Sequence, residues 1–407
     1  MAEEETFKVY GYRWVALAVF MAVVLVNQLA WITFAPITGV AAHYYGVSDL
    51  SIGLLSMSFM IVYLFVSIPA SWVIDTYGFR VWVGIGAALT ALFGLLRGLG
   101  GESYTLVLVA QIGIAAGQPF ILNALTKVAA RWFPLRERAT ATGLGTLAMY
   151  TGIVIGMLLT PILVLRSSIP AMLTAYGVAA LLAGLLFLIF SRERPPTPAN
   201  PPGQEERSLV FDGLRAMLRL RDFILLLAIF FLGLGVFNSV TTWIEDILRP
   251  RGFSIVQAGV VGGLMVIGGI LGAVILPVLS DRYRRRVPFI LLALAAAALG
   301  LLGITFAGTY PVLLFSAFTM GFFLLSAGPI GFQYGAEITY PAPEGTSNGL
   351  LLMMGQISGI LFILAMDSLK DPATGSMTAS LVVLAGLLVV GLFLSTRLRE
   401  STLLTRG

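Results

Sequence analysis

The sequence predicts an all-α membrane protein with twelve transmembrane helices in two six-helix bundles of similar sequence. Three observations predict this fold class: an apolar composition, twelve long apolar runs, and residue pairs that recur at a nearly constant spacing. Of the 407 residues, 58% are hydrophobic and 11% are charged, and the mean hydropathy is +0.94. A soluble domain usually carries roughly 25% charged residues, whereas a membrane-spanning helix needs about 20 mainly apolar residues. The lipid bilayer is therefore the first partner that we expect.

Apolar runs bounded by charged residues, glycine or proline give twelve candidate spans. They cover residues 13–42, 49–75, 80–99, 103–131, 137–165, 170–191, 222–249, 254–280, 287–307, 309–338, 345–367 and 375–396. Basic residues gather in the loops on one side, and such loops stay in the cytoplasm. An even number of spans then places both termini there. We expect a multi-pass protein of the cell membrane, and the short loops and arginine-rich composition favour a prokaryotic source.

The longest polar segment, 192–221, is rich in proline and predicts a cytoplasmic linker. It divides the chain into an N-terminal bundle, 1–191, and a C-terminal bundle, 222–407. Four matches recur in the same order across the linker: Asn27 with Asn238 (238 − 27 = 211), Ala116-Gly117 with Ala327-Gly328 (327 − 116 = 211), Asp75 with Asp281 (281 − 75 = 206), and Glu137 with Glu344 (344 − 137 = 207). This order indicates an internal repeat. Many secondary transporters are built from such repeats, with the substrate site near the bilayer midplane.

The residue types present argue against several other classes of protein. The chain has no cysteine and one histidine, His43, so we expect neither a metal site nor a cofactor. No nucleophile–base set is visible, so we do not expect an enzyme. The net charge of +5 is spread over short loops, so we do not expect nucleic acid as a partner. We expect a monomer that binds a small-molecule substrate.

Six uncharged side chains lie near the middle of their predicted spans: Trp31, Gln118, Asn238, Gln356 and, just before Trp31, Asn27 and Gln28. An amide that faces lipid is costly, so each should face a polar partner or a wet cavity. Hydrogen bonding between helices is the alternative for each of them. No Asp, Glu, Lys or Arg falls at this depth, and Lys127 and Glu337 lie where both can reach the cytoplasmic interface. A pocket of this kind favours a neutral solute or a soft cation.

Two acids, Glu245 and Asp246, lie near the outer end of the seventh span. Acids in this position can attract cations to an external mouth. Glu245 is also four residues before Arg249, and an exposed ion pair at this spacing is common on helices. We favour the exposed ion pair.

The loop after the second span reads Asp75-Thr-Tyr-Gly78-Phe-Arg80, and its repeat reads Asp281-Arg282-Tyr-Arg284-Arg285. Both resemble the conserved loop of the major facilitator superfamily, although the second copy lacks the glycine. Gly78 permits a tight reversal, and Asp75 can receive Arg80 or the N-terminal end of a neighbouring helix. Such a contact can act as a gate that closes the cytoplasmic side, whereas the alternative is loop charge for orientation only. The predicted gating residues are Asp75, Gly78, Arg80, Asp281, Arg282, Glu137, Arg138, Glu337 and Glu344.

A longer block runs from Glu337-Ile-Thr-Tyr340-Pro341 to Gly359-Ile-Leu361. With Trp31, Gln118 and several shorter stretches, it resembles the feline leukaemia virus subgroup C receptor-related carriers, a family linked to choline, ethanolamine and haem transport. The resemblance implies aromatic residues on helices one and seven around a quaternary ammonium, and glutamines on helices four and eleven. Three of these positions match Trp31, Gln118 and Gln356. The helix-seven position is Asn238 and not an aromatic residue, with Phe237 and Trp243 as substitutes.

These features together predict a secondary transporter that moves a small organic solute by alternating access. The leading substrate is a choline-like amine or quaternary ammonium, moved by facilitated transport. Trp31 could hold such a cation by cation–π attraction, worth about 2 kcal/mol when desolvated. Two alternatives stay open: a proton-coupled carrier of another small metabolite or drug, and a non-transporting membrane receptor.

Overall fold

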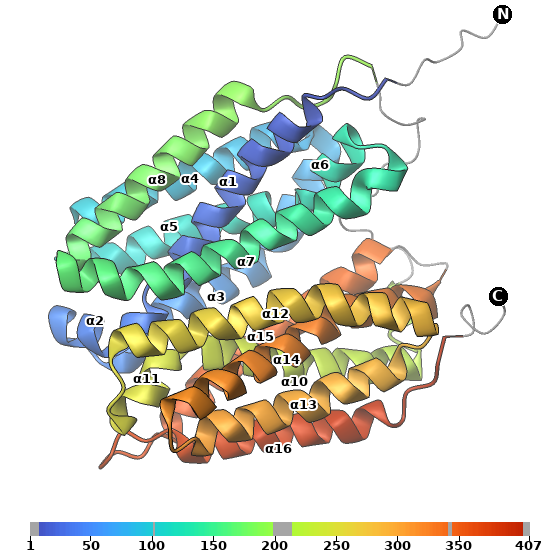
Figure 1. The fold of residues 1–407 in the computed structure, drawn as a ribbon. Coiled ribbons are helices and arrows are strands. Elements are labelled where there is room, and N and C mark those ends of the chain that lie inside the picture. The colour runs from blue at the N-terminus through green and yellow to red at the C-terminus, as the bar shows by residue number, and fades with distance from the viewer. Residues whose placement is uncertain (1–7, 101, 198–213, 341–343, 402–407) are drawn as a thin grey trace, which may run out of the picture. The chain divides into compact units, whose positions relative to one another are not determined.

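The structure is a computed structural model that describes residues 8–100, 102–197, 214–340 and 344–401. Within these ranges all regular elements are helices (Figure 1). The first half contains α1 (Arg13–Ile32), η1 (Ala35–Ile37), α2 (Thr38–Tyr45), α3 (Asp49–Tyr77), α4 (Phe79–Leu99), α5 (Tyr104–Leu122), α6 (Leu125–Trp132), α7 (Leu135–Arg166) and α8 (Ile169–Phe190). The second contains α9 (Leu214–Met217), α10 (Arg221–Thr242), α11 (Ile244–Leu248), η2 (Arg249–Arg251), α12 (Ile255–Tyr283), α13 (Val287–Phe306), α14 (Tyr310–Thr339), α15 (Glu344–Ser368) and α16 (Thr378–Ser395).

The described residues contain twelve helical segments that are long and apolar enough to cross a membrane. Two of them are interrupted helices, α1 to α2 and α5 to α6, and the others are α3, α4, α7, α8, α10 and α12 to α16. The twelve predicted spans are therefore confirmed, most of them to within three residues at each end. The clearest difference is in the seventh span, because α10 ends at Thr242 and a turn at Trp243 precedes the short α11.

The first span is also interrupted, at Thr33 and Phe34, between α1 and η1. Pro36 follows this turn, and proline has no N–H to offer to the carbonyl four residues earlier, that of Ile32. The helix therefore ends at Ile32 and restarts as α2. This break places Trp31 in the last turn of α1, where the backbone carbonyls lack partners within the helix.

The chain divides into two compact units, which we describe one at a time. Unit 1 comprises Met1–Trp31, Val62–Ile153 and Leu163–Leu209, and unit 2 comprises Ile32–Ile61, Val154–Ile162 and Val210–Gly407. Unit 2 thus includes α2 and the first part of α3 as well as the helices of the second half. These two units are defined by contacts in space, whereas the predicted boundary at 192–221 divides the sequence into two halves. That predicted boundary stays a prediction.

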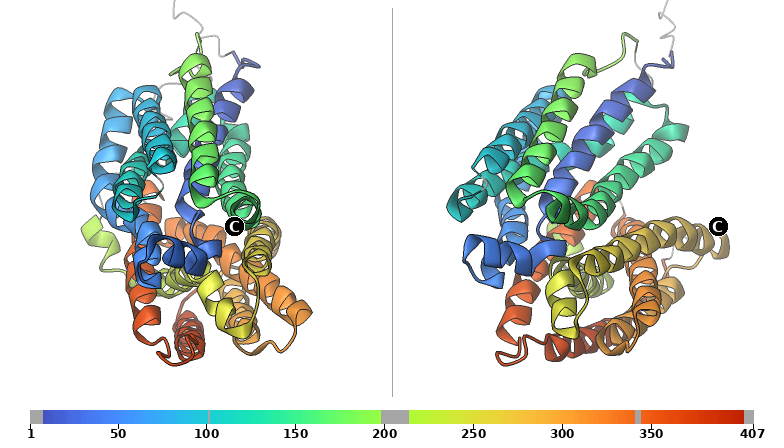
Figure 2. Two further views of the ribbon diagram at one scale, coloured as in Figure 1. Left: turned by 90° about the vertical axis from the view of Figure 1, so that its left-hand side faces the viewer. Right: turned by 60° about the vertical axis from the view of Figure 1, so that its left-hand side comes forward.

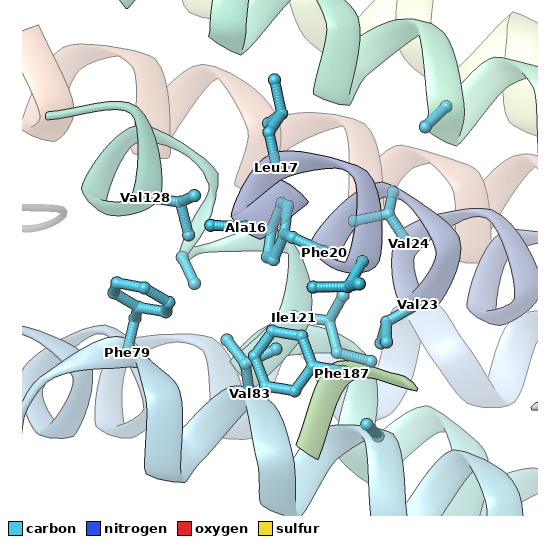
Figure 3. Packing of buried hydrophobic residues seen from close by; sticks show 14 of the residues in the cluster. Ala16, Leu17, Phe20, Val23, Val24, Phe79, Val83, Ile121, Val128 and Phe187 are labelled. Atoms are coloured by element: carbon cyan, nitrogen blue, oxygen red, sulfur yellow. The ribbon is translucent and has the colours of Figure 1, made fainter. Parts of the chain in front are cut away.

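In unit 1 a cluster of buried apolar side chains packs around α1. Figure 3 shows Phe20 of α1 close to Val83 of α4 and Phe187 of α8, and all three are buried. Helix α4 packs against both α5 and α8 (Figure 2). Glycines allow close approach, because a Cβ on Gly177 of α8 would lie 2.6 Å from the carbonyl oxygen of Gly94 of α4. Small residues at helix contacts are typical of packing in membranes.

Unit 2 repeats this pattern with the corresponding helices. Helix α13 packs against both α14 and α16, as α4 packs against α5 and α8 (Figure 1). Helices α12 and α14 approach closely, because a Cβ on Gly321 of α14 would lie 1.8 Å from the carbonyl oxygen of Met265 of α12. The third helix of each half therefore has equivalent neighbours, as the predicted internal repeat requires.

Candidate functional site

The end of α1 is held by two polar side chains from neighbouring helices of unit 1. Nη1 of Arg97, on α4, donates to the carbonyl oxygen of Ala30 at 3.1 Å and to Oε1 of Gln111, on α5, at 2.7 Å. Nε2 of Gln111 donates to the same Ala30 oxygen at 3.2 Å. A cation at a helix C-terminus is favourable because the helix dipole is negative there. These contacts fix the backbone one residue before Trp31.

Arg97 is buried, although it lies at the end of the predicted span 80–99. The side chain lies in the last turn of α4, and the residue is only 1% exposed. No pattern in the sequence indicates this burial, because an arginine at the end of an apolar run is usually assigned to the membrane surface.

Three of the predicted binding residues make contacts between helices. Nδ2 of Asn27 donates to Oγ1 of Thr90, on α4, at 3.1 Å. Nδ2 of Asn238 donates to the carbonyl oxygen of Gly355, on α15, at 3.1 Å. Nε1 of Trp243 donates to the carbonyl oxygen of Ile363, also on α15, at 3.2 Å, and the residue is fully buried. The amide nitrogens of both asparagines and the indole N–H of Trp243 thus form hydrogen bonds between helices, which is the alternative that we gave for polar side chains in the spans.

Other members of the predicted set keep polar atoms that have no partner among the residues that the structure describes. Among the described residues, neither Gln118 of α5 nor Gln356 of α15 makes a side-chain hydrogen bond, and Gln356 is half-buried. Nε2 of Gln28 and Oδ1 of Asn27 are buried and also lack a partner in the described parts of the chain. Trp31 and Phe237 are buried as well. Gln28, Gln118 and Gln356 therefore keep hydrogen-bonding capacity that a ligand could use.

A second interruption, between α5 and α6, is stabilised by Asn123. Oδ1 of Asn123 accepts from the hydroxyl of Tyr63 at 2.8 Å, and its Nδ2 donates to the hydroxyls of Ser67 and Ser71 at 3.0 and 2.9 Å. These contacts join α3 to the break in the fourth span. Asn123 and Tyr63 therefore hold these helices together. The amide of Asn123 and the hydroxyl of Tyr63 already have hydrogen-bond partners within the bundle.

The predicted turn after the second span is confirmed at Gly78. Its φ of +94° and ψ of 163° are accessible to glycine and strained for other residues. The α4 N-terminus that follows is capped by Glu193, which accepts from the backbone N–H of Phe79 at 3.2 Å and of Arg80 at 2.7 Å. Glu193 also pairs with Arg131 of α6. A carboxylate at a helix N-terminus is favourable because the dipole is positive there.

Asp75 has a different partner from the one that the sequence predicted. Nζ of Lys127, on α6, lies 3.4 Å from Oδ1 of Asp75, whereas Arg80 contacts Glu193 through its backbone. The side chain of Lys127 is only 4% exposed, so the expectation that it reaches the interface was wrong. The fourth span bends at Asn123, which directs α6 toward Asp75 and explains the pairing.

The second copy of the loop repeats the cap with other residues. Arg284, where the first copy has Gly78, adopts a left-handed conformation with φ of 51°. Glu400 accepts from the backbone N–H of Arg286 at 3.0 Å and of Val287 at 3.0 Å, and so caps α13. Glu193 and Glu400 are 207 positions apart (400 − 193), as are Phe79 and Arg286 (286 − 79). Sequence reasoning missed both glutamates, although this spacing is the one that relates Glu137 to Glu344.

The remaining predicted gating residues lie at the same ends of the helices. Glu337 of α14 pairs with Arg286 at 2.9 Å, and Asp281 pairs with the same guanidinium. The expectation that Glu337 reaches the interface was wrong, because its side chain is 9% exposed and faces Arg286.

Three further members of this set lie on α7 and α12, and one begins α15. Glu137 accepts from Nε of Arg13 at 3.2 Å, and Arg138 donates to the carbonyl oxygen of Ala130 at 3.2 Å. Arg282 is exposed, and Glu344 is the first residue of α15. Their gating roles stay predictions.

The end of the seventh span that is predicted to face outward carries an ion-pair cluster that the sequence did not predict. This outer cluster consists of Asp49, Glu245, Asp246, Arg249 and Lys370, all within unit 2. Nη2 of Arg249 and Nζ of Lys370 each lie 2.7 Å from Oδ2 of Asp49, and Lys370 also lies 2.7 Å from Asp246. Arg249 pairs with Asp246 as well.

The outer cluster corrects the expectation of an exposed pair between Glu245 and Arg249. The pair exists, with Nη1 and Oε2 at 3.2 Å, but Glu245 is 3% exposed and Asp246 is fully buried. The backbone N–H of Gly39, on α2, also donates to Oε2 of Glu245 at 2.8 Å. Burial raises the pKa of Glu245 and of Asp246, against the opposing attraction of Arg249. Sequence spacing shows only the intrahelical partner, so Asp49 and Lys370 were missed.

Comparison with known proteins identifies the family. The sequence profile described as Major Facilitator Superfamily matches residues 20–363. The chain belongs to this superfamily. It is accordingly a multi-pass secondary transporter that binds a small-molecule substrate, and not an enzyme.

Individual relatives agree with the narrower resemblance. The chain is 32% identical to "Solute carrier family 49 member A3" of Danio rerio over 380 residues, which is 90% of this chain and 80% of that protein. It is 31% identical to "Choline/ethanolamine transporter flvcr2b" of Danio rerio, over 94% of this chain and 83% of that protein. For "Choline/ethanolamine transporter FLVCR2" of Homo sapiens the identity is 29%, over 89% and 73%. The resemblance to this transporter family is confirmed. These relatives are eukaryotic, and the expected prokaryotic source stays a prediction.

Solved structures of the major facilitator superfamily share the fold. A bacterial homologue of the human lysosomal transporter Spinster superposes with a TM-score of 0.76 at 17% identity, over 96% of this chain and 98% of that chain. The transporter FucP superposes with a TM-score of 0.64 at 17% identity, over 95% and 98%. The predicted fold class, with twelve spans of the major-facilitator type, is therefore confirmed.

Proposed function

We propose that the transported solute is a choline-like amine or quaternary ammonium, moved by facilitated transport. Several relatives at about 30% identity are named choline/ethanolamine transporters. The observation that carries the proposal is that Gln118 and Gln356 make no side-chain hydrogen bond among the described residues. Their amides can accept from the hydroxyl or ammonium of such a solute without first breaking a contact between helices.

Trp31 supplies the second part of the proposed recognition. A quaternary ammonium has no N–H to donate, so an aromatic face is its best neutral partner, by cation–π attraction. The helix break after Trp31, and the bonds of Arg97 and Gln111 to Ala30, hold this tryptophan in a defined backbone position. Asn238 and Trp243 are assigned a supporting role, because their N–H groups already bond to α15.

The test is tracer uptake into liposomes that contain the purified protein. Uptake of choline should be saturable, and Trp31→Ala should raise KM about 30-fold, because about 2 kcal/mol of cation–π attraction is lost. Trp72→Ala is the matched control, since Trp72 of α3 is 60% exposed and should leave KM unchanged. Gln118→Leu and Gln356→Leu should also raise KM, whereas Asn238→Leu should mainly lower thermal stability. Absence of saturable uptake of choline and ethanolamine, or an unchanged KM in Trp31→Ala, would contradict the proposal.

A further inference from the structure

The outer cluster contains one carboxylate more than its bases can neutralise. Asp49 and Asp246 share both bases, since each contacts Arg249 and Lys370. In the described parts of the chain, Glu245 contacts one base, Arg249, at 3.2 Å, and it also accepts from the backbone N–H of Gly39. Three acids therefore face two bases, and two of the acids, Glu245 and Asp246, are buried, where an excess charge is costly. Glu245 is the member with the weakest compensation.

Glu245 also borders a cavity of about 510 Å³ at the outer end of α11. Its Oε2 atom is occupied by Gly39 and Arg249, whereas its Oε1 atom has no hydrogen-bond partner among the described residues. Asp49, Arg249 and His43 also line this cavity, which lies wholly within unit 2. A cavity of this size that several charged side chains line admits water, so protons can reach the second oxygen of a carboxylate that is otherwise buried.

We propose that Glu245 is an external proton-binding site, and that the proton bound there stabilises the closed arrangement of the outer cluster. The proposal rests on alternating access in a major-facilitator transporter and is independent of which solute is carried. The closed arrangement joins Gly39 of α2 and Asp49 of α3, from the first half, to residues that follow α10 and α15 in the second half. An outward opening must separate these elements.

The sign of the pH effect follows from the two environments of Glu245. In the closed arrangement, burial raises its pKa, and in an opened, hydrated arrangement it returns toward the ordinary value of roughly 4.3. The closed arrangement therefore binds more protons. The stabilisation of the closed arrangement by this proton is fully present below the pKa that Glu245 has in the open arrangement. It is lost as the pH rises through the higher pKa that Glu245 has in the closed arrangement. For one proton, the ratio of closed to open molecules changes by up to about tenfold per pH unit.

The bound proton enters from the outer side and returns to it when the cluster opens. It therefore adjusts how often the outer side opens, and it does not cross the membrane with the solute. External acid is expected to slow solute entry, and a proton gradient alone is expected to drive no accumulation.

Other charged groups lie near Glu245, but their surroundings suit this role less well. His43 of α2 lines the cavity but is exposed, so its environment changes little on opening. Asp367 of α15 is half-buried near Lys370 and adds to the negative excess. Arg251 of η2 donates to the carbonyl oxygen of Ile304 at 2.6 Å, at the end of α13, so it does not neutralise Glu245.

The experiment measures distances across the outer cluster as a function of pH. The chain has no native cysteine, so Tyr44→Cys and Leu369→Cys provide two spin-label sites without removal of other thiols. Both residues are more than 40% exposed, and they lie on α2 and just after α15. Electron–electron double resonance on the full chain in nanodiscs, without any solute, reports the populations of short and long distances.

Lowering the pH from about 8 to about 5 should increase the ratio of the short-distance to the long-distance population by up to about tenfold per pH unit, within the window that the pKa of Glu245 sets. In a Glu245→Gln background, which mimics the protonated acid, the short distance should dominate at every pH. A His43→Gln background should keep the pH response. Asp49→Asn, which weakens the bridge to Arg249 and Lys370, should favour the long distance.

Three results would overturn the proposal: an unchanged distance distribution from pH 8 to pH 5, a pH response that persists in Glu245→Gln, or a distribution that Asp49→Asn leaves unchanged. Accumulation of solute driven by a pH gradient would equally overturn it, in favour of proton coupling. None of the distance measurements depends on choline, so failure of the substrate proposal would be recognised separately.

Discussion

Replacing Arg97 with methionine removes the guanidinium that holds the end of α1. The guanidinium bonds to Ala30 and to Gln111, at 3.1 and 2.7 Å. Gln111 is fully buried, so Arg97→Met leaves its Oε1 atom without this donor, at a cost of about 1–3 kcal/mol. Loss of the cation at the helix C-terminus adds roughly 0.3–2 kcal/mol. We expect a total loss of about 1–5 kcal/mol, or on the order of 2–6 °C in the unfolding temperature.

A double-mutant cycle separates this local effect from general damage. Gln111→Leu removes the other member of the pair, and the double variant leaves neither side chain with an unsatisfied partner from this contact. Removal of both partners is less costly than the sum of the single changes, so the cycle should show a coupling of about 1–3 kcal/mol. Thermal unfolding in detergent, followed by intrinsic fluorescence, measures stability. The KM for choline uptake measures whether Trp31 keeps its position for substrate.

Two results would refute this reasoning. If the losses of stability in the two single variants add up to the loss in the double variant, the guanidinium and the amide do not act on the same carbonyl of α1. If stability falls but the KM for choline in the folded variants is unchanged, the end of α1 does not position Trp31 for substrate.

Two further predictions concern glycines. Gly321→Ala should lower stability by about 1–3 kcal/mol, because the new Cβ would lie 1.8 Å from a backbone carbonyl oxygen of α12. Gly328→Ala on the same helix meets nothing within 4 Å and should not lower stability, so equal unfolding temperatures would contradict the packing argument. Gly78→Ala should lower the unfolding temperature more than Gly143→Ala, because it combines a positive φ with a collision at the carboxylate of Glu193, whereas Gly143 is unhindered. An unaltered transition in Gly78→Ala would show that the turn adapts.

Most of the fold could be predicted because the bilayer imposes a simple rule on the sequence. A helix that crosses it must be long and apolar, so each run between charges or turns indicates a span. The rule fails where a span is interrupted. It missed the turn at Trp243, because Ile244, Ile247 and Leu248 continue the apolar pattern into α11.

The candidate site was harder to predict, because a polar side chain in a span has two uses that look alike in sequence. Asn27 and Asn238 are related by the repeat, and the amide nitrogen of each joins two helices. Gln118 and Gln356 resemble them in type and depth but make no such bond among the described residues. Only the geometry of neighbouring helices distinguishes these cases.

The partners of charged residues could also be predicted only in part from the sequence. The spacing of Glu245 and Arg249 correctly predicts their contact, but it carries no information about Lys370, which lies more than a hundred positions later. Burial of Glu245 and Asp246 is accompanied by contacts with these distant partners. An exposed pair was therefore the natural expectation from sequence alone.

The paired caps Glu193 and Glu400 have a practical consequence for dissecting this transporter. Both residues follow the last apolar helix of their half, where a truncation or fusion boundary would ordinarily be placed. A cut directly after Phe190 would deprive the third span of its anchoring carboxylate, although no apolar residue had been touched. Half-length fragments meant to reassemble should therefore retain a short polar tail, and the first half needs at least Arg192 and Glu193, whose backbone and side chain bind Trp132 and α4.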